Sequence, residues 1–335
     1  MISTHNSGKT AFSDSYGRKI EYVRLSVTDK CNLRCFYCMP EGFRGFEPTS
    51  NYLSFEEIER VMTAFAALGV HRVRLTGGEP LARKGLPDLI RKLSKIPGID
   101  DISMSTNALL LANKAAVLKQ AGASRLNVSL DSLKPDRFSQ ITRGGDLGRV
   151  IDGLEAAKVA GFSPIKINML VMKGINDDEV VDVTEFCLER GFTLRFIETM
   201  PIGPSGRQAV DHYVDLEKVK DKLASHYEMI PGVMPGGGPA RYMQIAGTDM
   251  CVGFITPLSR HFCSSCNRVR LAADGKIHLC LGNQHTFALR SLLRSGISDT
   301  ALEETVRKAL LLKPRKHDFV NQPDEIERTI SATGG

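Results

Sequence analysis

The sequence predicts an α/β protein built as an incomplete (β/α)6 barrel of the TIM type, followed by a C-terminal extension of short strands and helices. Strand-like and helix-like segments alternate over about residues 20–200 of the 335-residue chain, and the alternation stops after residue 200. Right-handed crossovers make the strands of such a series parallel. Six units of this kind curl into a partial barrel, and a doubly wound open sheet is the alternative.

The first elements follow from composition and spacing. A β-rich run covers 19–28 (KIEYVRLSVT). Ser54 then begins a helix, because Ser54 and Glu57 form a capping-box pattern ahead of apolar residues at helical spacing. Gly69 ends that helix. Later strands are expected over 70–76, 101–106, 125–130, 165–171 and 193–197, with helices between them that end near residues 96, 122, 161 and 191.

The chain changes character after residue 200. A helix is expected over about 215–226, and the segment PGVMPGGGP over 231–239 marks a boundary through its glycine and proline density. Short strands and turns follow, then two helices at roughly 285–295 and 299–312. The expected divisions are a loose tail over 1–16, a barrel over 17–230 and a C-terminal region over 231–335.

Composition excludes several classes of protein. The chain has no run of about 18 apolar residues that would span a membrane. Its first residues lack the apolar segment of a secretory signal, so a cytoplasmic location is expected. Eight cysteines in such a chain indicate metal binding or catalysis rather than disulfides. The net charge of +6 fits either a solvated basic surface or an anionic substrate.

Three cysteines, Cys31, Cys35 and Cys38, follow the first strand on one short loop. The ligand site of a barrel or an open parallel sheet lies at this end of the strands. Three thiolates on a [4Fe–4S] cube leave one iron open to a small molecule. Structural zinc is the alternative, although zinc usually takes paired CxxC motifs, which a CxxxCxxC spacing does not match.

The segment CNLRCFYC over 31–38 resembles the signature of the radical S-adenosylmethionine (SAM) superfamily. The resemblance implies that the open iron binds SAM and that one electron cleaves SAM to a 5′-deoxyadenosyl radical. The pKa values of side chains lie between about 4 and 13, far from the acidity of an unactivated C–H group. Hydrogen abstraction from such a carbon must therefore come from a cofactor. The resemblance places SAM contacts on four residues: Tyr37, Gly78 in the segment GGEP, Ser129 and Met200.

Cys263, Cys266 and Cys280 form a second set. Zinc is a real alternative here, because CxxC with a later cysteine and nearby histidines, His261 and His278, is a common zinc pattern. The surrounding segment FCSSCNRVR, however, resembles the GTP 3′,8-cyclase family, and the resemblance extends from about residue 18 to the terminal Gly-Gly. It implies a second [4Fe–4S] cluster whose open iron holds the guanine of GTP.

A triphosphate brings charge into a concave site, and burying it requires cations and donors. Arginine suits phosphate because its planar fork binds two oxygens. The resemblance places GTP contacts on Arg24, Arg74, Ser105, Lys166 and the run Arg268, Val269 and Arg270, and Arg195 on the sixth strand is a further candidate. Ser105 stands where the family usually has threonine, and Ala108 where glycine is usual.

The resemblance implies cyclisation of GTP to (8S)-3′,8-cyclo-7,8-dihydro-GTP, the first step of molybdenum cofactor biosynthesis. The radical removes hydrogen from C3′, and C3′ then bonds to C8; no side chain is assigned as acid or base. Also implied are an electron donor protein, cyclic pyranopterin monophosphate synthase as the next enzyme, a homodimer, and a Gly334-Gly335 tail that enters the active site. Neither a membrane nor a nucleic acid is an expected partner.

Two alternatives remain open at this stage. One is another radical SAM enzyme with an auxiliary cluster, such as a peptide-modifying enzyme. The other is a zinc module that binds nucleic acid through its basic surface.

Overall fold

The computed structural model describes residues 12–234 and 236–334. Its strands form one curved sheet in the order β12-β11-β10-β1-β2-β3-β4-β5-β6-β9-β8-β7. The eight central strands run parallel. They are β10 (Arg268–Leu271), β1 (Tyr22–Ser26), β2 (Arg72–Thr76), β3 (Asp101–Thr106), β4 (Arg125–Ser129), β5 (Ile165–Leu170), β6 (Thr193–Ile197) and β9 (Cys251–Ile255). Antiparallel strands extend both ends: β7 (Met229–Gly232), β8 (Arg241–Ile245), β11 (Lys276–His278) and β12 (Thr286–Ala288).

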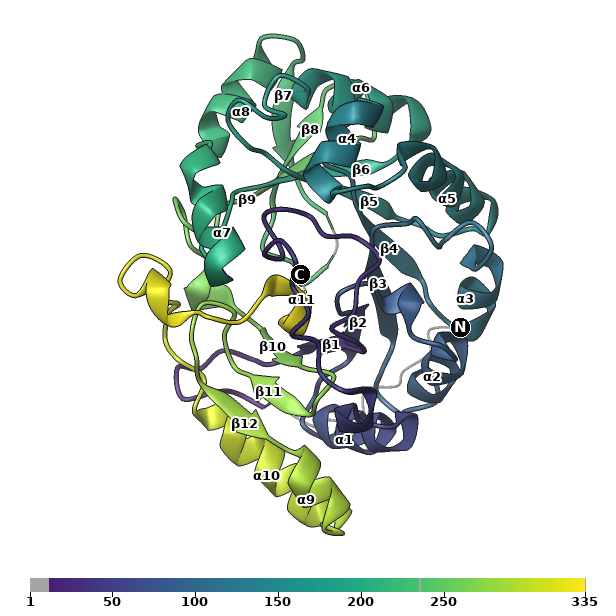
Figure 1. Ribbon diagram of the computed structural model, residues 1–335, viewed down its shortest axis with the longest axis vertical. Coiled ribbons are helices and arrows are strands. Elements are labelled where there is room, and N and C mark those ends of the chain that lie inside the picture. Colours follow the sequence, from purple (N-terminus) through teal and green to yellow (C-terminus); the bar gives the residue numbers. More distant parts are fainter. Residues whose placement is uncertain (1–11, 235, 335) are drawn as a thin grey trace, which may run out of the picture.

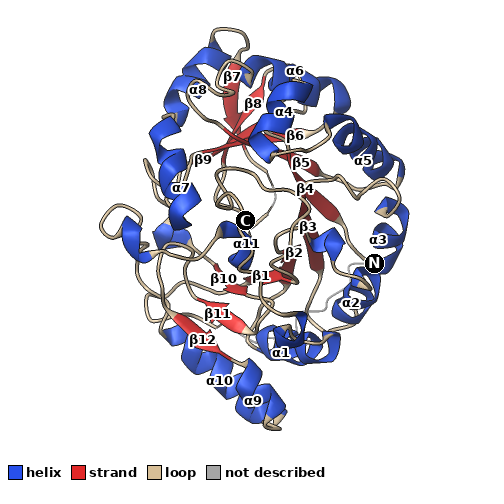
Figure 2. Ribbon diagram, viewed as in Figure 1, coloured by secondary structure: helices blue, strands red, loops and turns tan. Residues whose placement is uncertain are grey.

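Helices cover the convex side of the sheet (Figures 1 and 2). They are α1 (Phe55–Ala67), α2 (Leu86–Leu93), α3 (Ala115–Ala121), α4 (Pro135–Thr142), α5 (Leu147–Val159), α6 (Val180–Arg190) and α8 (Leu216–Ala224). The short helix α7 (Gly203–Ala209) lies instead at the open side of the ring (Figure 1). The C-terminal region adds α9 (Arg290–Arg294), α10 (Asp299–Leu311) and α11 (Ile330–Thr333), and α11 lies on the concave side (Figure 1). This one-sided arrangement is the predicted incomplete barrel rather than a doubly wound sheet.

The six predicted barrel strands are confirmed, and two of them, β3 and β6, have the predicted bounds. The capping box is also present: Ser54 Oγ accepts from Glu57 N and the Glu57 carboxylate accepts from Ser54 N. The helix predicted over 285–295 is wrong in its first half. Residues 286–288 form β12 instead, because Phe287 pairs with Ile277 at the edge of the sheet.

The predicted divisions remain predictions, but two observations bear on them. Residues 1–11 of the predicted tail lie outside the described residues, whereas Phe12 N donates to Leu68 O and Ser13 pairs with Lys19. The sheet also crosses the predicted boundary at residue 231. Strand β9, which follows that boundary in the chain, pairs with β6, which precedes it, and with β8. No helix among the described residues has both the length and the apolar content to cross a membrane.

The two faces of the parallel strands differ in character. Side chains such as Val23, Leu25, Val73 and Leu75 are fully buried in the apolar core that includes the helices. The alternate positions face the concave side and carry arginine, lysine, asparagine and tyrosine, where a closed barrel is normally filled by branched apolar residues. We call the space on the concave side the lumen. Burying so many cations there destabilises the free protein, and this cost indicates that the lumen binds an anionic ligand.

Candidate functional site

Cys31, Cys35 and Cys38 lie on the loop that follows β1, and all three are half-buried. The backbone turns tightly there, with Cys38 N and Met39 N both donating to Cys35 O. Burial, with repulsion between neighbouring thiolates, raises the pKa of Cys38 to about 12, and burial raises that of Cys31 to about 11. These thiols therefore stay protonated at neutral pH unless a metal centre displaces the protons.

The GGEP loop, residues 77–80, is bonded to the segment just before Cys31. Gly78 N donates to Thr28 O at 2.8 Å, and Glu79 N donates to Lys30 O at 2.9 Å. A Cβ on Gly78 would lie 2.6 Å from Asp29 O, so only glycine permits this approach. The buried Glu79 carboxylate accepts from Leu81 N, Thr106 Oγ1 and Asn107 N, which fixes the loop to the end of β3.

Replacing Gly78 with alanine is expected to push this loop away from the cysteine loop. The clash is with backbone atoms, so we expect a loss of about 1–3 kcal/mol in the free energy of unfolding, together with weaker SAM binding. Urea denaturation and equilibrium dialysis with iron-loaded protein measure the two effects. Gly144→Ala is the control, because it strains the backbone at φ +106° but places its Cβ within 4 Å of no atom in the described parts of the chain. SAM binding equal in the two variants contradicts the prediction.

A small cavity lies beside the first cysteine set. It is lined by Tyr37, Ser129 and Met200, three of the predicted SAM contacts, together with Asp131, Asn168, Leu170, Ile197, Ala209 and Ile330. Tyr37 Oη donates to Asp131 Oδ2 at 2.7 Å, and Asp131 Oδ1 accepts from Leu170 N. Burial raises the pKa of Asp131 to about 6, although these two hydrogen bonds act to lower it. The structure thus brings Tyr37, Ser129 and Met200 together, and Gly78 lies in the neighbouring loop.

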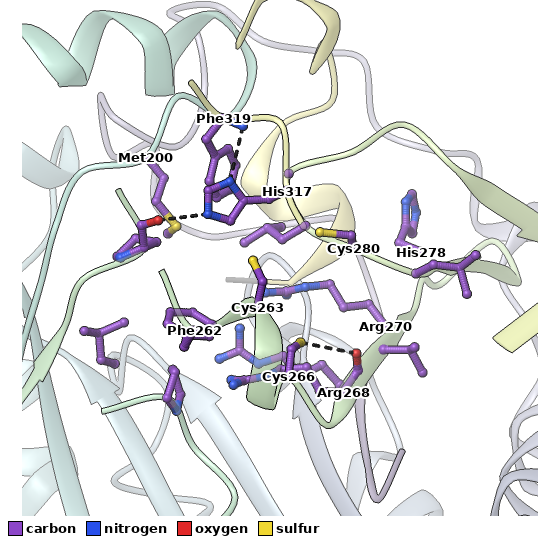
Figure 3. Close-up of a pocket in the computed structure, with 18 of the residues that line it drawn as sticks. Met200, Phe262, Cys263, Cys266, Arg268, Arg270, His278, Cys280, His317 and Phe319 are labelled. Atoms are coloured by element: carbon purple, nitrogen blue, oxygen red, sulfur yellow. Dashed lines mark hydrogen bonds between the residues drawn. The ribbon is translucent and has the colours of Figure 1, made fainter. Parts of the chain in front are cut away.

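The second cysteine set lines a larger cavity (Figure 3). Cys263 and Cys266 lie between β9 and β10, and Cys280 follows β11. Although burial opposes it, the cations Lys313 and Arg268 lower the pKa of Cys266 to about 7. Lys313 is 2% exposed and donates to Leu279 O. Lys313 acts on all three thiols of the second set, whereas in the first set a cation, Arg34, acts on Cys31.

Predicted GTP contacts line the same cavity. Arg24, Arg74, Arg195, Arg268, Val269 and Arg270 all border it together with the three cysteines. The strand register explains their grouping, because Arg24 pairs with both Arg74 and Arg270 on neighbouring strands. Burial and the neighbouring Arg74 lower the pKa of Arg195 to about 10. Arg24 Nε, Arg195 Nε and Arg268 Nε are buried without a hydrogen-bond partner among the described residues, as expected of groups that await a ligand.

A third cavity lies deeper in the lumen, toward the N-terminal ends of the strands. It shares Arg74 and Arg195 with the larger cavity and adds Lys166, Arg72, Arg125, Tyr22, Tyr242 and the glycines at 236–238. Its five cations face one carboxylate, Asp101, which pairs with Arg72 and Arg125. Burial and these cations lower the pKa of Lys166 to about 7.

Sequence reasoning missed some of these residues. Arg72 could have been found, because it precedes Arg74 by two positions and so shares its strand face. Arg125 and Tyr242 carried no comparable signal, since the register that brings them to the cavity is tertiary. Ser105 is not among the residues that line the three cavities; it lies on β3 beside Asn127. Ala108 has φ +62°, the conformation for which glycine is better suited.

The C-terminal residues enter the lumen. Arg270 donates to Thr333 O at 3.2 Å and to Gly334 O. A Cβ on Gly334 would overlap Thr76 Oγ1 at the end of β2, so the tail lies against the strand that leads into the GGEP loop. Gly335 lies outside the described residues.

The number of cysteines in each set is compatible with an iron–sulfur cluster. Each set supplies three thiols, the number that leaves one iron of a [4Fe–4S] cluster without a thiolate ligand. Within residues 12–234 and 236–334, no three Cys, His, Asp or Glu side chains are placed to share a single metal ion.

Comparison with known proteins gives two family matches. Residues 25–187 match the radical SAM superfamily, and residues 192–319 match the family described as Molybdenum Cofactor Synthesis C. The first match covers the cysteine loop of residues 31–38 and strands β2 to β5, and the second covers all three cysteines of the second set.

Two relatives match over nearly their whole length. The GTP 3′,8-cyclase of Hydrogenovibrio crunogenus is 47% identical over 332 residues, which cover 97% of this chain and 100% of the relative. The GTP 3′,8-cyclase of Marinobacter nauticus is 45% identical over 332 residues, with 98% and 99% covered.

The fold has a counterpart among solved structures. Streptococcus suis SuiB bound to S-adenosylmethionine superposes with a TM-score of 0.60 at 15% identity, over 87% of this chain and 69% of that one. At this identity the likeness concerns the fold alone.

Proposed function

Because the chain belongs to the GTP 3′,8-cyclase family, we propose that it cyclises GTP to (8S)-3′,8-cyclo-7,8-dihydro-GTP, the first step of molybdenum cofactor biosynthesis. A single observation carries the proposal. The cavity beside the first cysteine set and the cavity beside the second share Asn168, Ile197 and Met200 as walls. SAM in one cavity and a nucleotide in the other would therefore lie against the same three side chains.

The residues of the first cavity would hold SAM. Cys31, Cys35 and Cys38 would ligate a [4Fe–4S] cluster, which with SAM bound supplies the carbon radical that abstracts hydrogen from ribose C3′. The backbone of Gly78 and the side chains of Tyr37, Ser129 and Met200 would orient SAM. Tyr37 is fixed for this task by its bond to Asp131.

The residues of the lumen would hold GTP. We assign Cys263, Cys266 and Cys280 to a second [4Fe–4S] cluster that binds the guanine. The triphosphate would extend into the deeper cavity, where Lys166, Arg72 and Arg125 add to Arg24, Arg74 and Arg195. Pre-placed cations lower the cost of burying the phosphates, because they are fixed before the ligand arrives.

The radical also requires an electron from outside the chain, so an electron donor protein is a proposed partner. Cyclic pyranopterin monophosphate synthase is the proposed consumer of the product. We further propose a homodimer and a cytoplasmic location, which suits a cofactor that needs reduced thiols.

The test uses anaerobic, iron-loaded protein with SAM, a reductant and GTP. We expect about eight iron per chain, with 5′-deoxyadenosine and a cyclised nucleotide formed in equal amounts. Colourless protein with bound zinc supports the nucleic-acid module instead. Iron-loaded protein that cleaves SAM without consuming GTP supports another radical SAM activity.

The low pKa of Lys166 predicts a pH dependence of GTP binding. In the free protein, burial and the neighbouring cations lower the pKa of Lys166 to about 7. Above that pH the binding of a triphosphate must take up a proton, so affinity should fall by up to about tenfold per pH unit between about pH 7.5 and 9. Equilibrium binding of GTP without reductant measures this slope.

Two variants isolate the contribution of Lys166. Lys166→Arg keeps the charge at every pH, so it should bind GTP with a flatter slope and little loss of affinity at pH 7. Lys166→Met should bind weakly throughout. A wild-type slope in Lys166→Arg would assign the pH dependence to another group.

A further inference from the structure

Arg328 connects the C-terminal tail to the loop of the second cysteine set. Its Nη2 donates to Cys280 O at 3.2 Å, to Leu281 O at 2.6 Å and to Asn283 O at 2.7 Å. Its Nη1 donates to Gln284 Oε1 at 3.0 Å. One guanidinium therefore satisfies three backbone carbonyls of the loop that begins at a proposed cluster ligand. The three carbonyls converge on one nitrogen, so a lysine ammonium could reproduce only part of this network: it would lose the separate Nη1 bond to Gln284 Oε1.

The main chain beside Arg328 lies against the SAM side of the lumen. Gly203 N donates to Ile326 O at 2.9 Å, and a Cβ on Gly203 would lie 2.8 Å from Arg328 O. Gly203 has φ +66° and begins α7, three residues after the proposed SAM contact Met200. Residues 326–328 are thus held between the loop after β6 and the loop after β11.

Of the residues that follow Arg328, one lines the first cavity and two contact a wall residue of the second. Ile330 lines the cavity of Tyr37 and Met200. Thr333 O and Gly334 O accept hydrogen bonds from Arg270, which lines the cavity of the second cysteine set. These contacts are made by α11, a single turn of four residues that begins two positions after Arg328, and by Gly334, which follows it. A helix that short is not stable alone, so its position depends on the anchors at its two ends.

We propose that Arg328 is a positioning residue that holds residues 329–334 between the two cavities through its hydrogen bonds to the 280–283 loop. This proposal rests on the proposed function. The tail is in place only while that loop has its native backbone. Arg328 thereby links the order of the second cysteine set to the completion of the SAM cavity. It touches neither substrate, so its effect acts through Ile330 and through the carbonyls that orient Arg270.

Three variants test this role in full-length, iron-loaded protein. Arg328→Met removes the guanidinium and keeps an apolar stem, and Arg328→Lys keeps the charge. Arg294→Met is the matched control, because Arg294 also donates to two backbone carbonyls, Ser50 O and Tyr52 O, but on α9 away from the lumen. The readouts are iron content, hydrogen–deuterium exchange of residues 326–334, and the ratio of cyclised nucleotide to 5′-deoxyadenosine.

We expect Arg328→Met to keep its iron while the exchange protection of 329–334 is lost and the product ratio falls at least about tenfold. Arg328→Lys should give exchange protection and a product ratio between those of Arg328→Met and the wild type, and Arg294→Met should match the wild type in both. Protection equal to wild type in Arg328→Met overturns the proposal. Loss of the second cluster's iron also overturns it, because Arg328 would then serve the cluster loop and not the tail. If wild-type protein forms no 5′-deoxyadenosine, the proposed function fails, but the exchange measurement still decides the role of Arg328.

Discussion

Replacing Cys35 with alanine should abolish SAM cleavage, with formation of 5′-deoxyadenosine falling by at least about a thousandfold. Cys35 is the middle cysteine of the first set, and Cys38 N and Met39 N both donate to its carbonyl. Two remaining thiols cannot hold a [4Fe–4S] cube with one open iron, so iron should fall from about eight to about four per chain. Iron analysis and quantified 5′-deoxyadenosine measure the two effects.

Cys187 provides the matched control for this prediction. It is fully buried on α6 in the apolar core and belongs to neither cysteine set. Cys187→Ala should lower the free energy of unfolding by about 1 kcal/mol and leave iron content and SAM cleavage unchanged. Wild-type SAM cleavage in Cys35→Ala would refute the assignment of the first set.

The barrel was predictable because its periodicity is local. Each strand reads as a short β-rich run between a glycine and a polar turn, and β3 and β6 have the predicted bounds. The C-terminal strands were harder to predict. Residues 286–288 are a run of three, too short to show a strand period, and they form β12 where β11 offers an edge on which Phe287 pairs with Ile277. Tertiary pairing of this kind overrides local preference.

The cysteine sets and the central arginines were predictable for a different reason. Their residue types have few other uses in such a pattern, and the family resemblance assigned their roles. The deeper cavity was not predictable. Arg125 and Tyr242 lie on strands far apart in the sequence, and the side chains of β4 and β8 converge only when the sheet curls. Arg328 was missed because its partners are backbone carbonyls, which leave no trace in sequence.

Replacing Cys266 with alanine should separate SAM cleavage from cyclisation. The change removes one thiol of the second set and leaves the loop of Cys31, Cys35 and Cys38 intact, so iron should fall to about four per chain. The nucleotide would lose its anchor beside Arg268 while SAM keeps its cavity. We therefore expect residual 5′-deoxyadenosine but at least about a hundredfold less cyclised nucleotide, because misplacement by about 1 Å can itself cost about a hundredfold in rate.

The contrast with Cys35→Ala is what makes this experiment decisive. Both variants lose about four iron, but only Cys35→Ala should lose SAM cleavage altogether. Ser264→Ala, an exposed position in the same loop as Cys266, should behave as wild type and excludes a general disturbance of the loop. If Cys266→Ala instead cyclises GTP at the wild-type rate, the guanine is held elsewhere in the lumen. The cations at Arg24, Arg74 and Arg195 would then have to position the nucleotide without the second set.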